Sequence, residues 1–208
     1  MLLLSLKIYR VLCLKKACCL FIFSIIFGYS FAQNVAAING KSISVKEFLW
    51  AYKKSHNGIS STDYASLENY LNLYINFKLK VLDAREMGLD KNASYQEEIK
   101  TYEDALSTHK KVGVSNKDRD FLLNEYREGV LMFNVSEQKI WNKAQEDEQA
   151  VNEFYTKNQQ NYNKPLSEVR GEVIADYQLS LEEKLLKSLK QKYHVKINEN
   201  ELKKLAKL

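Results

Sequence analysis

Residues 63–88 read DYASLENYLNLYINFKLKVLDAREMG, and their pattern sets the class of fold. Apolar residues recur every three or four positions, which is the period of one helix face. This stripe consists of Leu67, Leu71, Tyr74, Phe77, Val81 and Ala84, and it is widened by Leu73, Ile75, Leu79 and Leu82. A helix that is apolar over so much of its circumference is covered by more than one neighbour. The stretch therefore predicts a long central helix over about 63–87, which Gly88 ends.

Shorter helical patterns lie on both sides of this stretch. Ser44 and Glu47 have the spacing of a capping box that opens a helix over about 45–55, and Ser94 and Glu97 repeat it before a helix to about 110. Further helices are expected over about 118–133, 137–145, 147–158, 166–192 and 199–207, with a boundary near 134–136. With only 7 Gly and 1 Pro among 208 residues, a turn-rich β-sandwich is excluded. The chain is predicted to be mainly α-helical.

Two short segments predict a small sheet. Asn39 and Gly40 stand between apolar pairs in residues 35–44, and both tolerate the positive φ of a tight hairpin turn. Residues 193–198, YHVKIN, alternate as one strand does. A single strand needs a partner, and the hairpin is the obvious one. We therefore expect the two ends of the folded chain to meet in one sheet.

The first 32 residues have the pattern of a secretory signal peptide. The basic residues Lys7, Arg10, Lys15 and Lys16 precede an uncharged apolar run, and Ser30 and Ala32 are the small residues of a cleavage site. The apolar run is short for a membrane span, which needs about 20 residues. We expect export and removal of residues 1–32, which leaves no integral membrane anchor; the alternative is an uncleaved anchor.

Removal of this segment changes the charge and the cysteine content. Lys and Arg fall from 31 to 27 against 26 Asp and Glu, so the net charge becomes +1. Nucleic-acid binding then has no electrostatic basis. Cys13, Cys18 and Cys19 are all lost, and with them any disulfide, thiolate metal ligand or cysteine nucleophile.

Signs of catalysis are absent from the sequence. It contains no glycine-rich nucleotide loop and no G-x-S-x-G motif. His56, His109 and His194 have no metal-ligand spacing, and paired glutamates such as Glu97 and Glu98 are typical of solvated helix faces. We therefore expect no catalytic residues, no metal site and no cofactor.

The aromatic residues give a stronger indication of function. Aromatic stripes on helices usually belong to the core, but they also line grooves for extended or unfolded polypeptide. Phe48, Leu49, Trp50 and Tyr52 crowd one short helix on all sides, which is more apolar surface than a small core covers. The candidate peptide-binding residues are Phe48, Trp50, Tyr52, Tyr74 and Trp141.

Several blocks of the chain resemble, in order, the SurA-like periplasmic folding factors, a family identified as peptidyl-prolyl isomerases and chaperones. The blocks are INGKSISVKEF (38–48), YLNLYINFKLKVLDAREMGLD (70–90), EYREGVLMF (125–133), IWNKA (140–144), EVRGEVIADYQ (168–178) and KYHVKIN (192–198). The block 70–90 is the most specific, because it is similar to an "FKLK…A…GLD" segment of that family. The resemblance implies a SurA-like chaperone core that binds unfolded outer-membrane or secreted polypeptides in the periplasm.

One departure from the family pattern bears on activity. The family places one or two parvulin domains between the early and the late helices, whereas this chain has only residues 111–117, KVGVSNK, at that position. The chain is therefore expected to divide into the signal peptide over 1–32, an N-terminal helical module over 33–110, a linker over 111–117 and a C-terminal helical segment over 118–208. The resemblance implies that the C-terminal segment packs back on the module. It also implies a protein without isomerase activity. The alternatives are a dedicated interaction subunit of an envelope complex and a degenerate isomerase.

Overall fold

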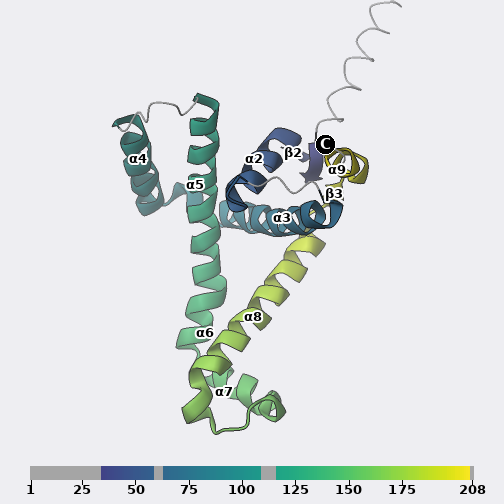
Figure 1. Ribbon diagram of the computed structural model, residues 1–208. Helices are drawn as coiled ribbons and strands as arrows, with labels where there is room; N and C mark the ends of the chain where they lie inside the picture. The colour runs from purple at the N-terminus through teal and green to yellow at the C-terminus, as the bar shows by residue number, and fades with distance from the viewer. Residues whose placement is uncertain (1–33, 59–62, 109–115, 207–208) are drawn as a thin grey trace, which may run out of the picture.

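The computed structural model describes residues 34–58, 63–108 and 116–206 (Figure 1). The strands are β1 (Asn34–Ile38), β2 (Lys41–Ser44) and β3 (Val195–Ile197), and the helices are α2 (Val45–Ser55), α3 (Tyr64–Glu86), α4 (Ala93–Thr108), α5 (Asn116–Ser136), α6 (Asn142–Glu146), α7 (Glu148–Lys157), α8 (Leu166–Lys192) and α9 (Glu199–Leu205). Short helical turns η2 (Leu89–Lys91), η3 (Glu137–Trp141) and η4 (Gln159–Asn161) join them. The predicted class, mainly α with a small sheet, is confirmed. The expected signal peptide, His109 and most of the expected linker lie outside the described residues.

The sheet joins the two ends of the described chain, as the sequence predicts. Its strand order is β2-β1-β3, and both pairs are antiparallel. Asn39 and Gly40 take φ values of +47° and +79°, which gives the tight turn between β1 and β2. The Asn39 side-chain oxygen accepts a hydrogen bond from the His194 N–H at 2.8 Å, and the Asn39 N–H donates to the His194 carbonyl at 2.9 Å. The turn residue thus also fixes the chain that enters β3.

The two predicted capping boxes have different outcomes. The Ser44 hydroxyl accepts a hydrogen bond from the Glu47 N–H at 3.1 Å, so α2 begins as predicted. The prediction that Ser94 caps the start of α4 is wrong, because α4 begins one residue earlier, at Ala93. Asn92 has an extended backbone, and its carbonyl accepts from the Gln96 N–H at 3.1 Å, so the first helical hydrogen bond forms before Ser94.

Helix α3 is the central element, and different faces of it enter different hydrophobic cores. One face contributes Leu67, Leu71, Ile75 and Leu79 to the head core, which also contains the sheet, α2, α9 and the end of α8. Another face, near the C-terminal end of the helix, contributes Val81 and Ala84 to a second core with α4 and α5. The expected coverage by several neighbours is therefore confirmed. Leu73 differs from the prediction, because 65% of its surface is exposed.

Helices α5, α6, α7 and α8 form an arm that extends from α3 (Figure 1). A third core lies inside it, with Ile140 and Ala144 facing Val173 and Tyr177. The boundary expected at 134–136 is wrong: α5 continues through the π-helical turn η3 into α6. Val135 and Ser136 are buried there, and the stretch holds no Gly or Pro, so the helix is kept intact by packing and widens at η3.

Ion pairs of two buried α3 residues, Lys80 and Asp83, tie the arm to α3. The Lys80 ammonium lies 2.5 Å from a Glu182 carboxylate oxygen on α8 and 3.3 Å from the Ser136 hydroxyl on α5. Asp83, one turn further along α3, pairs with Lys139 of η3 and lies 3.7 Å from the ammonium of Lys192. Because a buried charge is costly unless it is paired, these contacts favour one orientation of the arm. Within the described ranges, none of the helices combines the length and hydropathy of a transmembrane span.

Candidate functional site

A hollow of about 370 Å³ lies between α2, α3 and α5. We call it the aromatic groove, because its apolar lining includes Trp50, Tyr70, Leu73, Tyr74, Phe77 and Phe121. Its volume is within the range of small ligand pockets, which are concave and mostly apolar. The groove therefore has the size and lining to accept apolar groups.

Two aromatic walls form the groove. On α3, Tyr70, Tyr74 and Phe77 recur every three or four residues. The ring centroids of Tyr70 and Tyr74 lie 6.3 Å apart, and those of Tyr74 and Phe77 lie 5.9 Å apart. On the other side, Trp50 of α2 stacks on Phe121 of α5 with centroids 5.3 Å apart. The exposed Leu73 lines the same hollow. Rings that already pack on one another lose little conformational entropy when a ligand binds. The two walls are therefore ordered before an apolar group enters the groove.

A network of charges holds the α3 wall in place. The Tyr74 hydroxyl donates to a Glu47 carboxylate oxygen at 2.8 Å, and the Lys78 ammonium lies 2.7 Å from Glu47 and 2.5 Å from Glu128. Arg85 lies 3.3 Å from the other oxygen of Glu128. Glu128 is buried, so the carboxylate on α5 is met by two cations from α3.

The outer edge of the groove carries an exposed ion pair. Lys54 of α2 pairs with Glu125 of α5, and its ammonium lies 5.3 Å from the centroid of the Trp50 ring. Both side chains are about half exposed, so water and salt screen this pair. The edge is therefore only weakly closed.

A second hollow, of about 550 Å³, adjoins the first across α5. It lies between α4 and α5, where the rings of Tyr102 and Tyr126 stack with centroids 3.8 Å apart. The exposed Phe133 lines its other end. Glu125 and Gly129 line both hollows. The apolar surface thus continues around one side of α5.

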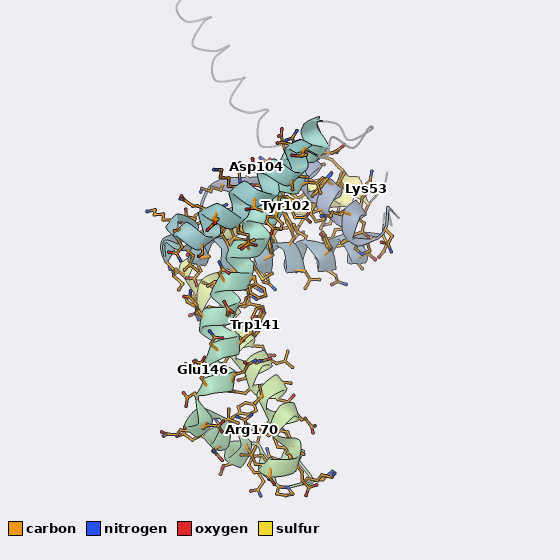
Figure 2. The ribbon with its side chains drawn as sticks, turned by 90° about the vertical axis from the view of Figure 1, so that its left-hand side faces the viewer. Lys53, Tyr102, Asp104, Trp141, Glu146 and Arg170 are labelled. Atoms are coloured by element: carbon orange, nitrogen blue, oxygen red, sulfur yellow. The ribbon has the colours of Figure 1, made fainter. Side chains whose placement is uncertain are left out.

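The structure separates the five candidate residues into three places. Trp50 and Tyr74 line the aromatic groove. Phe48 and Tyr52 are buried in the head core, so their rings present no surface to a peptide. Trp141 lies in the arm, where its ring meets that of Phe133 edge to face with the centroids 4.8 Å apart. Figure 2 shows Trp141 well below Tyr102.

Sequence reasoning missed several residues of the groove. Tyr74 and Phe77 belong to the predicted stripe and Tyr70 does not, and spacing does not tell which part of a stripe stays uncovered. Phe121 had no local signal, because it reaches the groove only through the packing of α5. Among the described residues, no group of three or more His, Cys, Asp or Glu is placed to hold a metal ion. The His56 ring stacks on Tyr52 at 4.2 Å, which is a structural contact.

Burial of tyrosines leads to a first prediction, on alkaline pH. Burial, reinforced by a hydrogen bond to Asp176, raises the pKa of Tyr162 to about 12, and burial with Glu86 raises the pKa of Tyr193 to about 12. Burial beside Glu47 also raises the pKa of Tyr74. An unfolded chain releases these protons near pH 10. Stability should therefore be retained below about pH 10 and fall between pH 10 and 12, as the unfolded state loses protons that the folded state keeps.

Urea unfolding at pH 8–12, with tyrosinate absorbance at 295 nm, measures this effect. Tyr162→Phe should make the decline between pH 10 and 12 shallower, and the difference from the parent protein isolates this one phenol. Native-state titration of every tyrosine near pH 10 would contradict the prediction.

Comparisons with known proteins give no relative: no family model matches this sequence, and neither a curated protein nor a solved structure does.

Proposed function

We propose that this protein is a chaperone-like factor of the periplasm that binds apolar segments of unfolded outer-membrane or secreted polypeptides, without catalysis. The observation that supports it is the aromatic groove, in which Leu73 keeps 65% of its surface exposed between two ordered aromatic walls. An exposed apolar surface of this kind is typical of a site for a polypeptide partner. The resemblance of the sequence blocks to SurA-like proteins supports the same function and the periplasmic location.

The lining of the groove fits a client of variable sequence. Rings and aliphatic groups make contacts that do not require particular hydrogen-bond donors or acceptors, so specificity should be broad. The second hollow extends the apolar surface past Gly129, which suits a segment longer than one or two residues. Such binding requires no cofactor and no ATP.

Aggregation of unfolded clients tests this proposal. An unfolded outer-membrane protein and an unrelated unfolded protein are each diluted into buffer, with and without purified residues 33–208, and light scattering is followed. Near-stoichiometric protein should suppress scattering from both clients. Leu73→Asp should remove most of the suppression, because it places a charge in the groove.

The matched control for that variant is Leu179→Asp on α8, where the original leucine is 63% exposed and lines neither hollow. It should suppress scattering as the parent protein does. Absence of suppression with both clients would contradict the chaperone function. Copurification with one folded envelope protein would then favour a dedicated interaction subunit.

Gly129 gives a further prediction, because it lines both hollows in the interior of α5. A Cβ at this position would meet no atom within 4 Å, so the packing of the protein does not require glycine. Gly129→Ala should raise the free energy of unfolding by about 0.5–1 kcal/mol, since glycine disfavours a helix. Gly129→Leu should instead weaken client binding, because its side chain would occupy the passage between the hollows.

Gly171 of α8 is the matched control, since a Cβ there also meets open space and the residue lines neither hollow. Gly171→Leu should bind clients normally in the same scattering assay. Full client binding by Gly129→Leu would show that clients do not pass over α5 at this point.

A further inference from the structure

Among the charged side chains that line the two hollows, acidic ones predominate. Glu47, Glu125 and Glu128 line the aromatic groove, and Glu98 lines the second hollow, whereas Lys54 is the only basic residue among the described residues lining either of them. Lys78 and Arg85 pair with Glu47 and Glu128, and the Lys78 ammonium also lies 5.3 Å from the centroid of the Tyr74 ring in the groove wall. Lys78 and Arg85 line a separate hollow that faces the hairpin residues of β1 and β2. The negative charge that remains along the apolar path therefore lies at Glu98 and, where its exposed pair with Lys54 opens, at Glu125.

Two of these carboxylates are open to a ligand. Glu98 is exposed and accepts a hydrogen bond at 2.9 Å from the neutral hydroxyl of Tyr126, a contact that leaves its charge in place. Glu125 lies where the hollows adjoin, and its partner Lys54 is a flexible, half-exposed side chain. An exposed pair of this kind is easily exchanged for another cation.

Lys54 itself shows how a cation is held at this place. Its ammonium contacts the Glu125 carboxylate and lies 5.3 Å above the Trp50 ring, so it gains both an ion pair and a cation–π contact. The stacked rings of Tyr102 and Tyr126 offer a second aromatic surface beside Glu98. A lysine or arginine of a bound chain would find the same two kinds of contact.

We infer that the occupant of the two hollows is an apolar segment of an unfolded polypeptide that carries a lysine or arginine beside its apolar side chains. The apolar groups enter between the aromatic walls, and the cation lies at Glu125 and Glu98. This inference rests on the proposed function and adds the substrate class. The groove thereby discriminates among unfolded segments by charge, favouring basic ones over acidic ones of equal hydrophobicity.

Synthetic peptides of one length test the inference. The sequence contains two tryptophans, so Trp141→Phe leaves Trp50 in the groove as the single reporter. Three peptides share alternating Phe and Leu residues and differ only in a central Lys, Gln or Glu; a fourth keeps Lys and replaces the apolar residues with Ser. The Lys peptide should bind most tightly and the Glu peptide least, with a ratio of roughly three to ten at low salt. The ratio should shrink in 0.5 M NaCl.

Variants of neighbouring residues provide the decisive comparison. Glu98→Gln should reduce the ratio between the affinities for the Lys peptide and the Glu peptide by about half or more. Glu97→Gln removes the same charge one residue earlier on α4, where it lines neither hollow, and should leave the ratio unchanged. Both residues are exposed, so the fold is not at risk.

The possible outcomes separate the two proposals. Equal binding of the Lys, Gln and Glu peptides would overturn the charge preference and leave the chaperone function standing. Failure of all three to bind would overturn both. Equal binding of the serine peptide would overturn the role of the groove, because only charge would then matter. A concentration-dependent dimer that Leu73→Asp abolishes would assign the groove to a second copy of the chain and overturn the inference.

Discussion

Phe48→Ala should lower the free energy of unfolding by about 3–5 kcal/mol, the cost expected when a buried phenylalanine leaves a cavity. Phe48 is fully buried, and its ring lies 6.2 Å from that of Tyr52 and 5.8 Å from that of Tyr70. It joins the sheet, α2 and α3 within the head core. Urea unfolding followed by circular dichroism measures the loss.

Trp50→Ala is the matched substitution, two residues away on the same helix. Trp50 is partly exposed in the groove, so its replacement should cost only about 1–2 kcal/mol, in the ordinary range for one residue, while it should lower client binding strongly. The two variants thus separate stability from binding. A Phe48→Ala protein of normal stability that had lost client binding would contradict the division of the aromatic residues described above.

Glu128→Ala should destabilise the protein by about 2–4 kcal/mol, the second large effect that we expect. Glu128 is 5% exposed and meets Lys78 and Arg85, so its removal takes away the carboxylate that both cations of α3 share. Lys78, which is itself mostly buried, would retain only Glu47. Chemical denaturation at neutral pH measures the difference.

Glu125→Ala serves as the control on the same helix, one turn earlier. Its pair with Lys54 is exposed, so its loss should change the free energy of unfolding by less than about 1 kcal/mol. Replacing Glu128 and Lys78 together with Met should recover part of the stability, because the cost comes from an unpaired buried charge. Equal losses from Glu128→Ala and Glu125→Ala would refute this assignment.

Those parts of the fold that depend on local chemistry could be predicted from the sequence. Asn39 and Gly40 specify the turn by their tolerance of positive φ, and Ser44 specifies the start of α2 by its hydroxyl. The pairing of β1 with β3 followed because a single strand needs a partner. The continuation of α5 through 134–136 could not be predicted, since Val135 and Ser136 are buried by contacts with distant elements.

The candidate site was predictable only in part, for a related reason. Trp50 and Tyr74 stood out as aromatics on helices, but so did Phe48 and Tyr52, which the head core covers. The groove exists only because α5 packs across α2 and α3; its edge pair, Lys54 and Glu125, is separated by 71 positions. A pattern within one short stretch of sequence does not reveal a contact between residues so far apart in the chain.

The pairing of the two chain ends has a consequence for how the protein is made. The hydrogen bond from His194 to Asn39 spans 155 positions, so the head core closes only after nearly all of the described chain exists. Leu202 and Leu205 fill that core from α9, and until they are synthesised, the surfaces of β1 and α3 that they cover stay open. At about 5–20 residues per second, roughly ten seconds separate α3 from α9 during translation. Such distant contacts also make folding slow. For that interval the newborn chain exposes the same kind of apolar surface that the protein is proposed to shield in its clients. A prematurely terminated chain would keep this surface exposed and become a target for proteases.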